Sequence, residues 1–344
     1  MIIYVITIIC FVIFGYCYDN ADQALKRILN ISVIIFLTIL FGFRYEVGAD
    51  WFNYIHAFEE YKYRDNFFET VEVGYRGLNY LAVYLGFDII FVNVICIFLF
   101  SLLSILSLHK LKLNPYYFMA VVAPYHLVMS GMNYSRQSVA LSFILMAVSF
   151  LLNNRKIGYF LCLLGAISFH KSAVIFILLY FLKIKIKYLI PAVLFVGTAT
   201  IYFMLGEYST LYLESSRYES AGFILRYGYL MICLLVLYQC RRYLVDNVFY
   251  SRLIFLIIGF SICIGFISFI STTAADRLSY YFILLSTLLI FHIKSKFNST
   301  KENNLIKFSA FILFLTSTSA FVVWAVFGSV SQYYKFNNYI YYLL

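Results

Sequence analysis

The stretch DIIFVNVICIFLFSLLSILSL (88–108) decides the fold class, because the twenty residues that follow Asp88 carry no charged side chain. A helix of about 20 apolar residues spans the roughly 30 Å hydrocarbon core of a bilayer. The rest of the chain has the same character, since 63% of its 344 residues are hydrophobic and 12% are charged. Soluble domains contain about 45–50% apolar and about 25% charged residues. The composition therefore excludes a soluble enzyme and predicts an all-α polytopic integral membrane protein.

About twelve apolar runs, separated by charged or turn-forming clusters, are the predicted membrane spans. Most connections are short, so we expect the whole chain, residues 1–344, to form a single transmembrane domain. Two connections, about 44–77 and 206–226, are long and are expected on the outer face. The predicted spans cover about 2–18, 28–43, 88–108, 115–130, 137–152, 157–169, 172–182, 188–205, 227–240, 252–270, 278–293 and 305–327.

Basic residues concentrate in alternate connections between the predicted spans, and this bias sets the expected orientation. Sixteen of the 26 Lys and Arg residues lie in these six connections, together with only four acidic residues. Because cytoplasmic loops are enriched in Lys and Arg, we expect this face to be cytoplasmic and both termini to lie outside. The net charge of +10 is then mostly a topology signal, and it does not indicate nucleic-acid binding.

The first long connection begins RYEVGADWFNYIHAFEEY (44–61) and predicts an amphipathic helix on the outer membrane surface. Trp51, Tyr54, Ile55 and Phe58 recur at intervals of three and four residues, which places them on one face of a helix. Such an aromatic stripe commonly anchors a helix in the membrane interface. Its alternative role is a platform on which sugar rings stack, and the sequence leaves both roles open.

A second group of cations lies at or near the predicted outer ends of the helices, where the positive-inside bias disfavours them. Charge close to the hydrocarbon is costly and often functional, and a guanidinium group offers parallel donors to phosphate oxygens. We therefore expect several of these cations to converge on an outward-facing pocket for a pyrophosphate. Pairing with nearby carboxylates is the alternative. The group comprises Arg44, Arg76, Arg136, Lys171, Arg217, Arg226 and Arg277.

Three other ionisable residues near the outer helix ends are candidates for chemistry. His170 lies in FHKS (169–172) at a predicted outer turn, where an imidazole can act as a general base. Asp50 and Glu72 are the carboxylate candidates, with ordinary ion pairing as their alternative role. The sequence contains no DxD, GxSxG, P-loop or GxGxxG motif, so nucleotide-dependent and serine-hydrolase chemistry are not supported. No residue pattern demands a metal or another cofactor, and metal-independent chemistry is expected.

Five short motifs follow one another within about residues 40–285. They are Arg44-x-x-x-Gly48-x-Asp50 with Tyr54, Glu72-x-Gly74-Tyr75, Arg136-Gln137, Phe169-His170-x-Ser172 and Arg277-x-x-Tyr280-Tyr281. In this order and spacing they resemble the EpsG/Wzy family of bacterial O-antigen and exopolysaccharide polymerases. The resemblance implies a helical bundle similar to that of C-type membrane glycosyltransferases, in the bacterial inner membrane, with its active site and both termini facing the periplasm.

The resemblance also implies a reaction. Such a polymerase transfers a growing glycan from undecaprenyl pyrophosphate to the terminal sugar of a second lipid-linked repeat unit. Its partners would be these lipid-linked donors and acceptors, the bilayer and, as a candidate, a chain-length regulator protein. The alternatives are an O-antigen ligase and, among proteins that are not enzymes, a lipid-linked oligosaccharide flippase. Charges are nearly absent from the interiors of the spans, which favours transfer at the membrane surface over transport.

Roles for individual residues follow from the same resemblance. Arg136 and Arg277, supported by Arg44, would hold the pyrophosphate and stabilise it as the leaving group. His170 or Asp50 would deprotonate the acceptor hydroxyl. The residues expected to bind or orient the substrate are Tyr54, Glu72, Arg76, Gln137, Lys171, Arg217, Tyr280 and Tyr281.

Overall fold

A computed structural model describes residues 1–63, 72–183, 191, 220, 222–243, 247–294 and 300–342 of the chain. Across these residues the regular structure is helical, and the β-contact is an isolated antiparallel bridge between Arg44 and Asn338. Eight of the described helices are long and apolar enough to cross a membrane. The predicted class, an all-helical polytopic membrane protein, is therefore confirmed.

Eight of the predicted spans coincide with these long helices. They are α1 (Ile2–Asn20), α2 (Gln23–Leu37) continued by the π-helical η1 (Thr38–Gly42), α5 (Ile89–Lys110), α8 (Ser135–Leu152), α12 (Phe223–Cys240), α13 (Val248–Ile267), α14 (Thr272–Lys294) and α15 (Thr300–Phe327).

Three more predicted spans are helical but shorter or interrupted. They correspond to α6 (Pro115–Ala123) with the π-helical η2 (Pro124–Ser130), to α9 (Lys156–Phe169), and to η3 (Lys171–Ile177) with α10 (Leu178–Phe181). The predicted span 188–205 lies outside the described residues, apart from Pro191. The count of about twelve spans therefore stays a prediction.

The chain forms two compact units. The first comprises Met1–Ala173 and Ser329–Leu344, and the second comprises Val174–Gly328. That the whole chain acts as one transmembrane domain stays a prediction.

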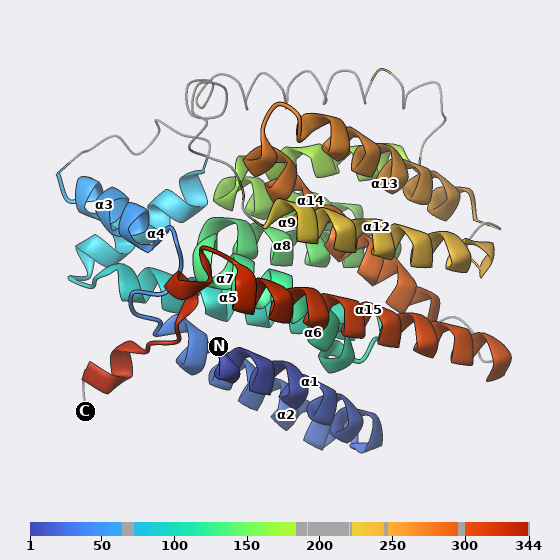
Figure 1. Ribbon diagram of the computed structural model, residues 1–344, viewed down its shortest axis with the longest axis horizontal. Coiled ribbons are helices and arrows are strands. Elements are labelled where there is room, and N and C mark those ends of the chain that lie inside the picture. The colour runs from blue at the N-terminus through green and yellow to red at the C-terminus, as the bar shows by residue number, and fades with distance from the viewer. Residues whose placement is uncertain are drawn as a thin grey trace. The chain divides into compact units, whose positions relative to one another are not determined.

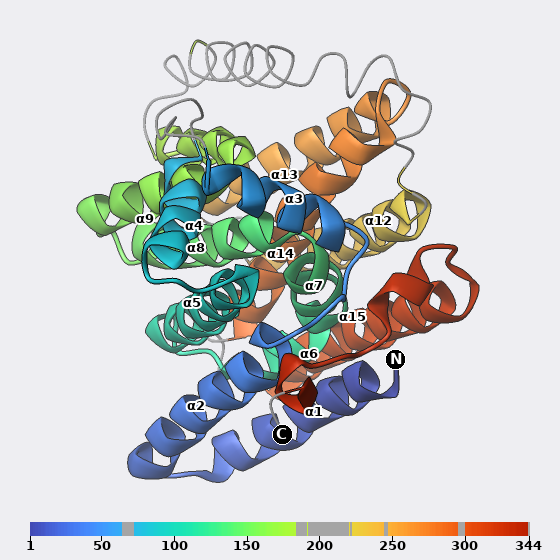
Figure 2. The ribbon, with the colours of Figure 1, turned by 90° about the vertical axis from the view of Figure 1, so that its left-hand side faces the viewer.

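In the first unit, α1 and α2 pack side by side, and α8 lies between α5 and α9 (Figures 1 and 2). Close approach of α8 and α9 depends on two glycines of α9. A Cβ atom added at Gly158 would lie 2.5 Å from the Phe150 ring, and one added at Gly165 would lie 2.8 Å from the Phe143 ring. Small residues allow this kind of close helix packing in membranes. The tightly packed α8 is the helix that carries Arg136.

The predicted surface helix is present as α3 (Trp51–Tyr61). Its aromatic stripe faces the protein, since Trp51 and Phe58 are 3% and 2% exposed, while Phe52 on the opposite side is 67% exposed. The neighbouring helices α4 (Val73–Tyr84) and α5 contact α3. Protein therefore covers Trp51 and Phe58, while Tyr54 and Ile55 are half-buried, and the role of the stripe as a membrane anchor or a sugar platform stays a prediction.

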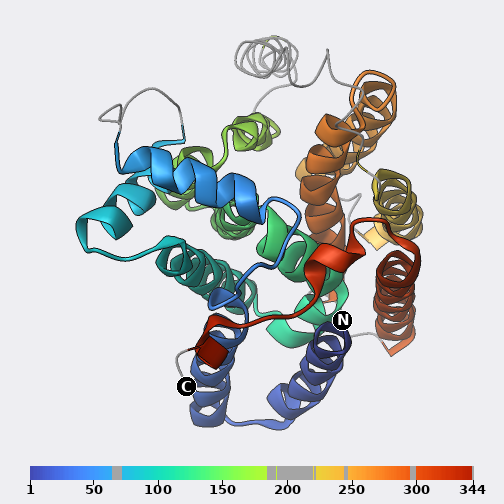
Figure 3. The ribbon, with the colours of Figure 1, turned by 60° about the vertical axis from the view of Figure 1, so that its left-hand side comes forward.

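The C-terminal residues belong to the first unit and include two short 3-10 helices, η5 (Ser331–Tyr334) and η6 (Tyr339–Tyr342). The segment 333–339 runs beside the loop 43–48 that joins η1 to α3 (Figure 3). The backbone N–H of Tyr339, for example, donates to the Phe43 carbonyl at 2.7 Å. Two segments that are far apart in the sequence, 43–48 and 333–339, are therefore joined by backbone hydrogen bonds.

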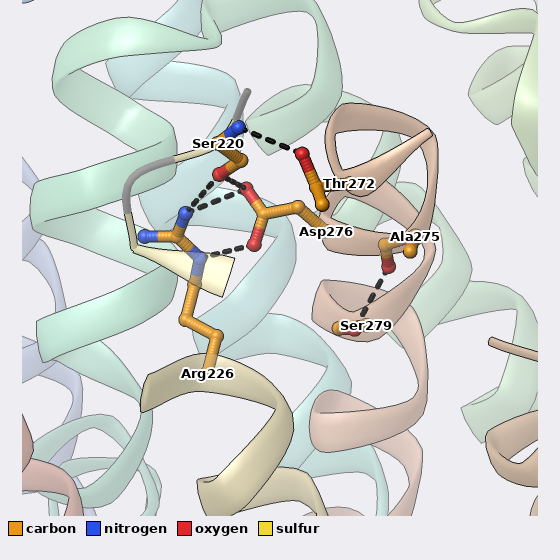
Figure 4. Close-up of polar contacts among 6 residues, drawn as sticks. All are labelled: Ser220, Arg226, Thr272, Ala275, Asp276 and Ser279. Atoms are coloured by element: carbon orange, nitrogen blue, oxygen red, sulfur yellow. Dashed lines mark hydrogen bonds and ion pairs between the residues drawn. The ribbon is translucent and has the colours of Figure 1, made fainter. Parts of the chain in front are cut away.

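In the second unit, α14 packs against α12, α13 and α15. A buried ion pair joins α12 to α14: Arg226 Nη2 donates to Asp276 Oδ2 at 2.7 Å, and Nε donates to the other carboxylate oxygen (Figure 4). The Ser220 hydroxyl accepts from Arg226 at 2.8 Å and donates to Asp276 at 3.0 Å. A Cβ atom at Gly222 would lie 2.5 Å from Arg226 Nη1, so glycine leaves room for the guanidinium.

Asp276→Ala should lower the free energy of unfolding by about 3–5 kcal/mol, because it removes the carboxylate that compensates a buried guanidinium. Ser279→Ala is the matched control on the same helix, since the Ser279 hydroxyl only donates to the Ala275 carbonyl one turn earlier (Figure 4). Its effect should stay within about 1 kcal/mol. Thermal unfolding of the detergent-purified protein measures both changes, and equal effects of the two variants would contradict the prediction.

Candidate functional site

Glu72 is the centre of a polar cluster in the first unit. Its Oε2 atom accepts a hydrogen bond from Arg136 Nη1 at 2.7 Å, and its Oε1 atom lies 2.8 Å from His170 Nδ1. The backbone N–H of Lys171 donates to the same Oε1 atom at 3.3 Å. One carboxylate thus joins residues that are 64 and 98 positions away in the sequence. We call Glu72, Arg136 and His170 the Glu72 cluster.

Each member of the Glu72 cluster lies at the end of a helix. Glu72 immediately precedes α4. Arg136 is the second residue of α8, which begins after a helix break at Tyr134 (φ −103°, ψ 62°). His170 follows the last residue of α9 and has an extended backbone (φ −153°, ψ 116°), which turns its side chain out of the helix. Two helices begin and one ends at these positions, and their polar residues meet there.

Two aromatic rings hold the Arg136 guanidinium from α3 and α4. Its central carbon lies 5.5 Å from the ring centroid of Tyr54 and 5.5 Å from that of Tyr75, within the range of cation–π attraction. The side chain of Arg136 is 33% exposed, whereas that of Glu72 is 10% exposed. Arg136 is therefore fixed on one side and accessible on the other, as an anion-binding residue must be.

The cluster keeps Glu72 ionised. Burial raises the pKa of Glu72, but Arg136, the His170 side chain and the Lys171 N–H together outweigh burial and lower its pKa well below the ordinary value. An ionised carboxylate can only accept hydrogen bonds, so the Nδ1 atom of His170 is the donor. In a neutral imidazole with this tautomer, Nε2 carries the lone pair and is the proton acceptor.

Arg44 lies outside the cluster and is 2% exposed. Its guanidinium donates to the Gly131 carbonyl at 2.5 Å, to Asn93 Oδ1 at 2.8 Å and to the Ser135 hydroxyl at 2.7 Å. Arg44 is thus occupied by protein groups, and its part in pyrophosphate binding stays a prediction.

Three more candidate residues of the first unit are also engaged elsewhere. Asp50 pairs with Asn133, whose side chain donates to Asp50 Oδ2 at 3.4 Å. Arg76 is 9% exposed and lies 5.7 Å from the Tyr61 ring centroid. Gln137 follows Arg136 in α8 and is buried. Their predicted roles in catalysis or binding stay untested.

The remaining candidates belong to the second unit or fall outside the described residues. Tyr280 and Tyr281 on α14 are fully buried. The Tyr280 ring lies 5.6 Å from the Arg226 guanidinium, and the Tyr281 ring packs on another aromatic ring of the same unit. Arg277 follows Asp276 on α14. Arg217, in the long connection 206–226, is outside the described residues.

Sequence reasoning gave no role to Tyr75 and missed Asn133 altogether. Tyr75 is part of the motif Glu72-x-Gly74-Tyr75. Its place three residues after a candidate carboxylate was the sequence signal that could have identified it as a site residue. Asn133 is 3% exposed within an apolar region, and a buried amide in such a region usually has a specific partner. Among the residues that the structure describes, no group of three or more His, Cys, Asp or Glu residues is placed to hold a metal ion.

These observations define a polytopic helical membrane protein with a cluster of arginine, histidine and glutamate at its helix ends. The model of the EpsG family matches residues 27–341, and the chain belongs to this family. Membership confirms the resemblance found in the sequence motifs and indicates a membrane enzyme of the polysaccharide-polymerase type. No curated protein and no solved structure matches the chain.

Glu72→Gln should destabilise the protein at neutral pH, because it removes the negative charge that Arg136 and His170 face. The pKa of Glu72 is lowered in the folded state. Its stabilising contribution is therefore fully present above the ordinary pKa of 4.5 and is lost as the pH falls toward the lowered value. Thermal unfolding of wild type and variant should differ more at about pH 5 than at about pH 3, two values at which an ordinary imidazole carries the same charge. A difference that grows in acid would contradict this assignment.

Proposed function

We propose that this protein is a polysaccharide polymerase that transfers a growing glycan from a lipid pyrophosphate to the terminal sugar of a second lipid-linked repeat unit. The observation that carries the proposal is the Glu72 cluster, in which one carboxylate holds a partly exposed arginine beside a histidine. Family membership supports a polymerase-type reaction. The proposal includes undecaprenyl as the lipid, the periplasmic face of the bacterial inner membrane as the location of the site, and periplasmic termini.

Arg136 is the proposed group that stabilises the leaving pyrophosphate. As the bond between the anomeric carbon and the pyrophosphate oxygen breaks, its electrons pass to that oxygen and negative charge develops there. A guanidinium group held in place before the reaction stabilises this charge without reorganising. Tyr54, Tyr75 and Glu72 supply that preorganisation in the first unit. Lys171 remains a further proposed cation of the donor site, and the part of Arg277, which belongs to the second unit, stays a prediction from the sequence.

His170 is the proposed general base. Its Nε2 atom takes the proton of the acceptor hydroxyl while the acceptor oxygen forms the new bond to the anomeric carbon. Glu72 accepts the Nδ1–H and stabilises the imidazolium that results, as the aspartate of a catalytic triad does. We favour His170 over Asp50 because the Asp50 carboxylate already accepts from Asn133.

Arg136→Ala and His170→Ala should each lower polymerisation by about 10²–10³-fold, the usual cost of losing a charge-stabilising donor or a general base. The measurement is the surface glycan profile of a deletion strain that expresses each variant at the wild-type level in its membranes. Arg155→Ala is the matched control, because Arg155 is exposed at the start of α9 and lies outside the Glu72 cluster. It should support wild-type chain lengths.

The same profile separates the alternatives. A single repeat unit in the deletion strain, extended only by wild type and the control, supports a polymerase. Long chains that remain on the lipid carrier would indicate a ligase, and repeat units trapped on the cytoplasmic face would indicate a flippase. Normal chain lengths with both alanine variants would contradict the assignment of Arg136 and His170.

A further inference from the structure

We propose that the loop 44–50 is a positioning element for Arg136: it docks on the break between two helices and fixes the point at which α8 begins. The loop carries the motif Arg44-x-x-x-Gly48-x-Asp50, which the proposed reaction does not use. The inference rests on the proposed function of Arg136 and assigns no chemical step to the loop itself.

The break that the loop contacts directly precedes Arg136. The short helix α7 (Gly131–Asn133) ends at Asn133, Tyr134 is not helical, and α8 begins at Ser135. The Tyr134 N–H still donates to the Ser130 carbonyl at 2.6 Å, so the break is a defined turn. A small rotation at this turn moves the Arg136 guanidinium, and a misplacement of about 1 Å can cost about 10²-fold in rate.

Arg44 connects the two sides of the break. It donates to the carbonyl of Gly131 before the break and to the hydroxyl of Ser135 after it, at 2.5 and 2.7 Å. Its third partner, Asn93, belongs to α5, at 2.8 Å. One planar guanidinium group with fixed donor directions therefore ties both helix ends to a third helix.

Gly48 allows the loop to approach the break closely. Its backbone φ is +108°, a conformation that residues other than glycine rarely adopt. A Cβ atom at this position would lie 2.2 Å from the Met132 carbonyl oxygen and 3.1 Å from Asn133 Oδ1. Both the backbone conformation and the contact with α7 therefore require glycine.

Asp50 and Asn133 exchange hydrogen bonds across the same contact. The backbone N–H of Asp50 donates to Asn133 Oδ1 at 2.7 Å, and Asn133 Nδ2 donates to Asp50 Oδ2 at 3.4 Å. Asn133 is the last residue before the break at Tyr134. This pair thus holds the end of α7, the helix that precedes the break, whereas Arg44 also holds the start of α8.

The C-terminal segment 333–339 covers the other side of the loop. The Gly48 N–H donates to the Tyr333 carbonyl at 2.8 Å, and the Tyr45 N–H donates to the Asn337 carbonyl at 3.2 Å. The loop therefore lies between the helix break and the C-terminal segment, and it makes directional bonds to both. Because the loop is held on both sides, it cannot shift easily, and the helix break that it contacts stays in a fixed position.

The first test exchanges the two partners of the hydrogen-bonded pair. Asn133→Asp alone places two carboxylates in contact and should weaken binding of farnesyl pyrophosphate by the detergent-purified full chain by about tenfold. In the double variant Asp50→Asn/Asn133→Asp, the backbone N–H of residue 50 still donates to a side-chain oxygen at position 133, and the side-chain bond runs in the reverse direction. This variant should restore binding to within about twofold. It should also restore polymerisation in the deletion strain.

The exchange separates positioning from chemistry. If Asp50 were the general base, the double variant would bind the pyrophosphate and still fail to polymerise, and this result would overturn the inference. Equal binding by wild type and Asn133→Asp would overturn it too.

The second test compares two glycines with positive φ. Gly48→Ala should weaken farnesyl pyrophosphate binding by about tenfold. Gly86→Ala is the matched control, because Gly86 has φ +74° but a Cβ atom there would meet no atom within 4 Å. It introduces comparable backbone strain without a clash and should bind within about twofold of wild type. Equal losses in the two variants would overturn the inference, and if Gly48→Ala does not fold, the exchange variants carry the test.

Failure of the proposed function gives a different result. Wild type would then not bind farnesyl pyrophosphate, or Arg136→Ala would bind it as tightly as wild type does. When wild type binds and Arg136→Ala does not, unchanged binding by both Asn133→Asp and Gly48→Ala refutes the positioning role of the loop alone.

Discussion

The Glu72 carboxylate is the constraint on which the arrangement of the first unit depends. A buried charge is tolerated in an apolar bundle only when opposite charge and hydrogen-bond donors surround it. Glu72 obtains these from the start of α8, the end of α9 and the backbone that follows. Three helix ends must therefore meet at one point for the unit to be stable. The same requirement leaves an arginine and a histidine side by side, so the electrostatics that stabilise the fold also assemble the site.

Much of the fold could be predicted from the sequence, because apolar runs and their charged boundaries follow from the thickness of a bilayer. Eight predicted spans correspond to long helices of the structure. A connection between the predicted spans 115–130 and 137–152 was expected, but the sequence did not show that the break narrows to Tyr134 or that α8 begins at Ser135. The role of the aromatic stripe of α3 was left open for a related reason. Periodicity identifies an apolar face, but it does not show whether lipid or protein covers that face.

For the candidate site, the sequence identified which residue types lie at helix ends, but it did not show which side chains contact one another. Arg136, His170, Glu72 and Tyr54 were all candidates, and the structure brings them together. Arg44 and Asp50 were candidates on the same grounds, yet they contact the helix break instead. The difference depends on backbone geometry at Gly48 and on the buried amide of Asn133, which act across about 85 residues of sequence separation. Motif spacing alone contains no information about such long-range pairs.

The contact between loop 43–48 and segment 333–339 also has a consequence for biogenesis. The Tyr339 N–H donates to the Phe43 carbonyl, so the loop emerges from the ribosome long before its covering segment does. Insertion of the early helices can proceed helix by helix, but the loop meets the segment that covers it only after residues 333–339 have been synthesised. Contacts of such high sequence separation form late and slowly. The packing of this loop is therefore completed only after the helices that lie between the two segments in the sequence have been synthesised.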